Sequence, residues 1–269
     1  MRTPFPIVLS ALLIGCIEVD LPSESKLDRL RILSAKAEPA EPAPGDTVTM
    51  QSLTWSPESG DIGVVWEMCM SADCPTVRVR EDPGPLLDAG VVDVAEGIVG
   101  LEPATPPSFT VPRGLLDGMS EADQQEGTFL RFGLTAVPLD VSGATELEWA
   151  TKDLPISASD APNKNPVLTG IVVDGVAHAP GDTLTVSGGA LSLALADEDT
   201  LTEDYTFQSS DGETEARTED LSVSWYSDLG ALEGDTWSPG SGAKQGVLIV
   251  VVRDGRGGTD WLTFSVNRQ

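Results

Sequence analysis

The sequence predicts an all-β fold made of two antiparallel β-sandwiches in tandem. Short apolar or alternating segments are separated by turns rich in glycine and proline, of which the 269 residues hold 27 and 20. No segment shows a sustained 3.6-residue apolar period with helix caps, so helical crossovers between parallel strands are not expected. One seven-residue pattern occurs twice, which indicates two units of similar construction.

The repeated pattern is a turn followed by the start of a strand. Residues 43–49 are Ala-Pro-Gly-Asp-Thr-Val-Thr and residues 179–185 are Ala-Pro-Gly-Asp-Thr-Leu-Thr, so six of the seven positions are identical. Pro-Gly favours a type II turn because proline fixes φ and glycine accepts a positive φ. The Thr-aliphatic-Thr that follows alternates as a half-buried strand does. Each copy therefore predicts a turn leading into a strand near the start of a module.

The module boundaries follow from this repeat and from a polar stretch between its copies. We expect the first module at residues 28–157, a linker at 158–165 and the second module at 166–269. The linker is polar and is interrupted by Pro162 and followed by Pro166, as is typical of a connection between domains.

Five strands are expected in each module. Those of the first module are residues 30–37, 47–53, 63–68, 128–137 and 147–154. Those of the second are residues 167–173, 183–195, 221–226, 246–252 and 261–266. The best helical candidate is the short segment 114–125. Strands joined by Gly/Pro turns favour antiparallel sheets, most simply a sandwich.

The first residues of the chain resemble a bacterial lipoprotein signal. Arg2 precedes an apolar run at residues 5–14, which is long enough for a signal-peptide core and too short to span a bilayer. The run ends in Leu13-Ile-Gly-Cys16, which resembles the lipobox, where a small residue precedes the lipidated cysteine. The resemblance implies that residues 1–15 are a cleaved signal peptide and that Cys16 carries acyl chains such as palmitate.

The same resemblance has consequences for location. Two or three acyl chains hold a protein firmly on a membrane, whereas one chain binds reversibly. Residues 16–27 then form a lipidated tether. Ile17 stands where an inner-membrane lipoprotein carries a retention aspartate, which implies the outer membrane of a Gram-negative cell, facing the periplasm or the surface.

The modules themselves resemble a known class of fold. Residues 246–266 hold an apolar strand, the turn Asp-Gly-Arg-Gly-Gly and a return strand, similar to the last two strands of bacterial Ig-like, PKD-like and cadherin-like modules. Trp225 resembles the tryptophan that packs in the core of such sandwiches, and Trp66 is its counterpart in the first module. The chain thus resembles bacterial lipoproteins with tandem Ig-like or PKD-like β-sandwich modules. The resemblance implies a fold and no particular chemistry.

The composition excludes several functions. With 16 Lys+Arg against 43 Asp+Glu, the formal charge of −27 leaves too few cations to neutralise a run of phosphates, so no nucleic acid is expected as a partner. The single histidine, His178, aligns with Pro42 of the other repeat copy, which argues against a catalytic imidazole. No G-x-S-x-G elbow occurs. We expect no catalytic residues and no enzyme activity.

Cys69 and Cys74 are the remaining thiols once Cys16 is lipidated. Four residues separate them, and an exported chain meets an oxidising compartment, so we expect a disulfide. A redox pair is usually the tighter C-x-x-C, and no histidine or further cysteine lies nearby to complete a zinc site.

The acidic segment, residues 197–220, is the feature that folding explains least. Gly45 and Trp66 are 21 residues apart in the first module, whereas Gly181 and Trp225 are 44 apart in the second. The surplus holds the acidic segment, which we expect to be an exposed loop that the fold does not need.

Two interpretations of the acidic segment stay open. Asp197, Asp199 and Asp204 are candidate Ca²⁺ ligands, because hard cations prefer clustered carboxylates. The alternative is a solvated loop with no ligand. No other cofactor is expected.

These observations favour a non-catalytic, lipid-anchored envelope protein that acts as an adhesion, scaffold or binding module. Its partners are the membrane and an unidentified envelope protein or glycan. The alternative is a carbohydrate-binding protein or enzyme with a site in the long loops, since exposed tryptophans can stack on sugar rings. The tryptophans not needed as central core residues are Trp55, Trp149, Trp237 and Trp261.

Overall fold

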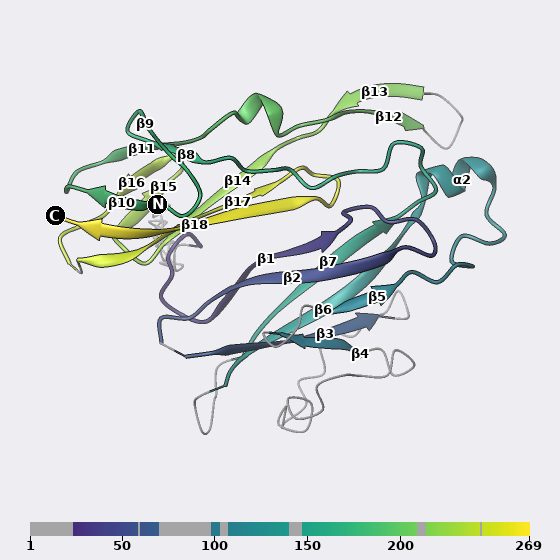
Figure 1. The fold of residues 1–269 in the computed structure, drawn as a ribbon, viewed down its shortest axis with the longest axis horizontal. Helices are drawn as coiled ribbons and strands as arrows, with labels where there is room; N and C mark the ends of the chain where they lie inside the picture. Colours follow the sequence, from purple (N-terminus) through teal and green to yellow (C-terminus); the bar gives the residue numbers. More distant parts are fainter. Residues whose placement is uncertain are drawn as a thin grey trace, which may run out of the picture.

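A computed structural model shows that the protein is nearly all β-structure in antiparallel sheets, which confirms the predicted fold class (Figure 1). The structure describes residues 24–58, 60–69, 98–102, 107–139, 147–208, 214–242 and 244–269. Cys16, the signal segment and Cys74 lie outside these ranges. Within them, no helix is both long and apolar enough to cross a membrane.

The first lobe packs a three-stranded sheet against a four-stranded sheet. The smaller sheet has the order β1-β2-β5, with β1 at Arg31–Glu38, β2 at Thr47–Trp55 and β5 at Ser108–Thr110. The larger has the order β4-β3-β6-β7, with β3 at Ile62–Cys69, β4 at Ile98–Glu102, β6 at Thr128–Pro138 and β7 at Glu148–Ile156. Trp66 and Phe132 are fully buried between them.

The second lobe also consists of two sheets and has its own core. One sheet has the order β10-β18-β17-β14, with β10 at Thr183–Val186, β14 at Ser222–Ser227, β17 at Gln245–Arg253 and β18 at Thr259–Arg268. The other has the order β15-β16-β11-β8-β9, with β8 at Ile171–Val173, β9 at Val176–His178, β11 at Leu191–Leu195, β15 at Ala231–Glu233 and β16 at Thr236–Ser238. Phe264 and Trp225 are buried in this core.

Three further elements complete the structure. The short helix α2 spans Glu121–Glu126, the 3₁₀ turn η2 spans Glu198–Thr200, and a separate two-stranded ribbon pairs β12 at Asp204–Gln208 with β13 at Thr214–Thr218. We call this ribbon the β12–β13 hairpin. It extends from the second lobe over the end of the first lobe that carries α2 (Figure 1).

The two copies of the repeat form the same turn. Gly45 and Gly181 have φ of 97° and 89°, and the N–H of Asp46 and of Asp182 donates to the carbonyl three residues before it. The aspartate carboxylate in turn accepts from the backbone N–H of that same first residue, at 2.9 Å and 2.8 Å. The type II turn is thus confirmed at both sites.

The strands after the two turns are nevertheless placed differently. β2 pairs antiparallel with β1 and β5, whereas β10 pairs parallel with β18, the last strand of the chain. The predicted strand 183–195 is wrong as a single element, because it divides into β10 on one sheet and β11 on the other. The predicted helix 114–125 is reduced to α2.

Trp237 has a core role that the sequence did not indicate. It was expected outside the central core, yet its side chain is fully buried, and its indole Nε1 donates to the carbonyl of Leu229 at 2.9 Å. Trp149, by contrast, is 56% exposed on β7.

Trp237→Ala should destabilise the protein by about 3–5 kcal/mol, because it leaves a large cavity in the second core and an unpaired carbonyl. The matched control is Trp149→Ala, expected within about 0.5 kcal/mol of wild type. Chemical denaturation measures both. Similar losses for the two variants would contradict the assigned burial.

Candidate functional site

The two lobes meet at an apolar contact of their own. Leu27 and Leu33 from the first part of the chain pack against Ile249 and Val251 of β17, in a cluster separate from both cores. Trp55 and Trp261 pack against the edge of this cluster. The lobes are therefore joined by buried surface, and these two tryptophans are committed to packing.

The linker is part of the junction. The Asn163 backbone N–H donates to Glu41 of the first lobe at 2.7 Å, and its side-chain Nδ2 donates to Asp254 of the second at 2.9 Å. Asn165 behaves similarly, because its Nδ2 donates to the Ala37 carbonyl and its Oδ1 accepts from the Thr259 N–H. The linker thus fastens both lobes rather than spacing them.

Arg256 lies where the lobes and the hairpin meet. Its guanidinium pairs with Glu41 at 3.3 Å and with Glu219 at 3.2 Å, and its Cζ lies 4.2 Å from the ring centroid of Tyr205. The position of this arginine is fixed from its own turn, since its backbone N–H donates to Asp254 at 2.8 Å. One cation therefore links the first lobe, the end of the hairpin and β12.

Glu219 is the buried partner in this arrangement. Its side chain is 1% exposed, and besides Arg256 it accepts from the backbone N–H of Glu203 at 2.9 Å. Burial raises the pKa of the Glu219 carboxyl, and the hydrogen bond from Glu203 and the charge of Arg256 oppose that rise.

The described part of the acidic segment is mostly exposed, as expected, but the expectation that it forms a loop is wrong. Residues 204–208 and 214–218 pair as a β-hairpin, and the segment is held at both ends by buried side chains, Leu201 in the second core and Glu219 at Arg256. The strand faces between these ends are mostly exposed. The segment is thus a fixed ribbon with open surfaces.

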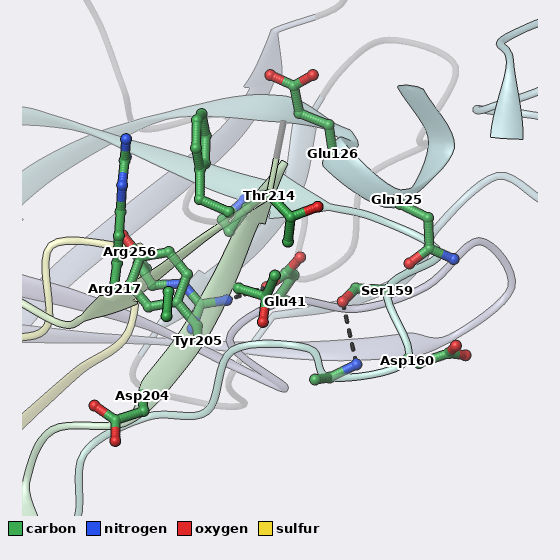
Figure 2. A pocket seen from close by; sticks show the side chains of 15 residues that line it. Glu41, Gln125, Glu126, Ser159, Asp160, Asp204, Tyr205, Thr214, Arg217 and Arg256 are labelled. Atoms are coloured by element: carbon green, nitrogen blue, oxygen red, sulfur yellow. Dashed lines mark hydrogen bonds and ion pairs between the residues drawn. The ribbon is translucent and has the colours of Figure 1, made fainter. Parts of the chain in front are cut away.

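A cleft of about 690 Å³ separates the hairpin from the first lobe (Figure 2). Helix α2 contributes Gln125 and Glu126. Ser120 caps this helix, because its Oγ accepts from the Asp123 N–H at 3.2 Å. The linker contributes Ser159 and Asp160. Hairpin residues in the wall are Asp204, Tyr205, Thr206, Phe207, Thr214, Ala216 and Arg217, and Glu41 and Arg256 also line the cleft.

The cleft wall contains more negative than positive side chains, and its two arginines are already paired with glutamates. Arg217 is paired with Glu215 at 2.7 Å, which raises the pKa of its guanidinium, and Arg256 is paired with two glutamates. No such pair with a cation involves Glu126, Asp160 or Asp204 within the described ranges. The cleft therefore carries a net negative charge.

A second cleft, of about 390 Å³, lies between β1, β7 and the turn after β17. It contains Lys152, whose Nζ donates to the Gly257 carbonyl. Burial lowers the pKa of this amine, and the nearby carboxylate of Asp254 opposes that effect. This lysine is part of the contact between the lobes, so the second cleft belongs to the junction.

The candidate calcium ligands are not gathered. Asp197 adopts a left-handed conformation at the start of η2 and accepts from the Thr169 hydroxyl at 3.2 Å, while Asp204 accepts from the Thr218 hydroxyl at 2.7 Å. Asp199 lies within η2. In the part of the chain that the structure describes, no group of three or more His, Cys, Asp or Glu could hold a metal ion.

The other sequence candidates lie apart from the cleft. His178 ends β9 in the second lobe. Cys69 ends β3, and the disulfide with Cys74 stays a prediction because Cys74 lies outside the described residues. The residues that sequence reasoning missed are Arg256, Glu41 and Tyr205. Aromatic residues at alternate positions, Tyr205 and Phe207, are typical of a strand and could have indicated the hairpin.

In comparisons with known proteins, no protein-family model matches the chain, and no curated protein matches it significantly. The function of the cleft is therefore inferred from its own geometry.

Arg256→Met should cost about 3 kcal/mol at neutral pH, because it leaves the Glu219 carboxylate buried without its cation. The pKa of Glu219 then rises further, so the folded state binds a proton at a higher pH than the unfolded chain does. The loss should shrink as the pH falls from about 7 to about 5. Denaturant titrations across this range measure it.

Arg217→Met is the matched control, because Arg217 also stacks on a ring, at 4.0 Å from the Phe207 centroid, but is exposed. Its expected cost is within about 0.5 kcal/mol. A loss for Arg256→Met that is independent of pH would contradict the role of Glu219.

Proposed function

We propose that this protein is a non-catalytic, lipid-anchored component of the cell envelope that binds a partner through the cleft beside the β12–β13 hairpin. The proposal includes Ig-like modules as the framework and the outer membrane of a Gram-negative cell as the location. The observation that carries it is the open, charged cleft held in a fixed position by Arg256.

The placement of the cleft suits a protein tethered at its N-terminus. The chain enters the described structure at the end of β14, where the Leu27 N–H donates to the Ser227 carbonyl and the Ser227 N–H donates to the Ser25 carbonyl. The hairpin joins the opposite end of β14, before Ser222. These ends are separated by the length of a six-residue strand, about 20 Å. The hairpin is therefore directed away from the attachment.

The pairing of the cleft residues favours recognition. Arg217 and Arg256 are each held by a glutamate and an aromatic ring, so they shape the walls and are not free to move protons. One face of each ring, Tyr205 and Phe207, is covered by the stacked guanidinium. That covering disfavours stacking on sugars and favours a polar or peptide partner.

Cys16→Ser should move the protein from the membrane fraction to the soluble fraction, because the cysteine sulfur and the amino group it exposes are the acylation sites. Cys69→Ser is the control and should stay with the membrane. Fractionation with immunodetection measures the effect. An unmodified thiol at residue 16, found by intact-mass analysis of the native protein, would refute the anchor.

The binding site is tested by site-specific photo-crosslinking in intact envelopes. A photoreactive residue in place of Asp160, inside the cleft, should capture a discrete partner. The same residue in place of Trp149, exposed on the edge strand β7, is the control and should not. Absence of capture at residue 160 under conditions that preserve anchoring would contradict the proposed function.

A further inference from the structure

We propose that the free edge of β12 binds an extended, basic segment of a partner protein as an added third strand. This inference rests on the proposed function and names the class of partner that the cleft takes.

The register of the hairpin shows which groups of β12 are available. The Glu219 N–H donates to the Glu203 carbonyl, and the next residues pair as Asp204 with Thr218 and Tyr205 with Arg217. In an antiparallel pair, residues that exchange hydrogen bonds alternate with residues that do not. Positions 205 and 207 therefore bond to β13.

Asp204 and Thr206 consequently direct their backbone N–H and C=O groups away from β13. Within the described part of the chain, no other backbone group is hydrogen-bonded to the outward N–H and C=O groups of these two residues. An open edge with free donors and acceptors is a template for another strand.

β12 lines a space of suitable size. β12 contacts α2 of the first lobe, and both line the cleft of about 690 Å³, with Asp204 in its wall (Figure 2). Thr206 also lines the cleft. A paired strand needs a separation of about 4.8 Å in the hydrogen-bonding direction, and ligand clefts commonly hold about 300–1,000 Å³. An added strand therefore has both hydrogen-bonding groups and room.

Charge selects the occupant. Glu126, Asp160 and Asp204 line the cleft without paired cations among the described residues, and both arginines there are already neutralised. A second copy of this chain, with a formal charge of −27, would be repelled. A partner segment rich in lysine or arginine is attracted, and its backbone matches the β12 edge.

The test uses purified full-length protein and a capped heptapeptide of alternating lysine and valine. Thr206→Pro removes an outward N–H of β12 and leaves the bonds to β13, since proline is tolerated at a free strand edge. Thr218→Pro is the matched control: Thr218 is opposite Asp204 in the same ribbon, it does not line the cleft, and its N–H points to the outer edge of β13.

Wild type and Thr218→Pro should bind the peptide with similar affinity, within about twofold, while Thr206→Pro should weaken it at least about tenfold, measured by calorimetry. Asp160→Asn should weaken it by about two- to fivefold, because one attractive charge is lost. A peptide N-methylated at alternate residues, or one with glutamate for lysine, should not bind. No binding to wild type, or equal loss in both proline variants, overturns strand addition.

The crosslinking experiment separates this inference from the proposed function. If the partner captured at residue 160 is still captured in the Thr206→Pro background, the cleft binds a partner but strand addition is overturned. If capture is lost with Thr206→Pro and kept with Thr218→Pro, strand addition is supported. If residue 160 captures nothing even in wild type, the proposed function itself fails.

Discussion

The guanidinium of Arg256 links the first lobe to the β12–β13 hairpin, which forms one wall of the cleft. Its side chain is 19% exposed and its partners Glu41 and Glu219 are 11% and 1% exposed. Charges at this depth are costly to leave unpaired and are weakly screened by salt. The three charged groups therefore hold one arrangement, and that arrangement joins residues 215 positions apart in the sequence.

The turn that carries Arg256 is shaped by both lobes. Asp254 is fully buried and accepts from the N–H groups of Arg256 and Gly258 and from the linker residue Asn163. A Cβ on Gly258 would lie 2.8 Å from the Lys164 carbonyl of the linker and would collide with Asp254. Gly258 therefore permits the linker to approach the turn between β17 and β18.

The sequence predicted the features that depend on interactions between neighbouring residues, and it was misleading for features that depend on tertiary contacts. The two Pro-Gly turns and most strands follow from residues that are neighbours in the chain. The hairpin was missed because the acidic composition of residues 197–220 outweighed the alternation of Tyr205 and Phe207. Trp237 was misplaced because its strand has three residues, too few for a periodic signal. The junction of Arg256 with Glu41 depends on tertiary placement, which no local pattern encodes.

The acidity of the hairpin and its open edges are related, because the negative charge prevents the open edges from pairing with a second copy. A two-stranded ribbon with free backbone groups is a liability, because identical edges can pair and aggregate. Asp204 on β12, the neighbouring carboxylates of Glu126 and Asp160 and the formal charge of −27 repel a second copy at short range, and salt screens that repulsion beyond about 8 Å. The same carboxylates attract a segment of opposite charge. The negative charge that prevents self-association therefore also makes the open edge selective for a basic strand. Solubility and recognition thus depend on the same residues.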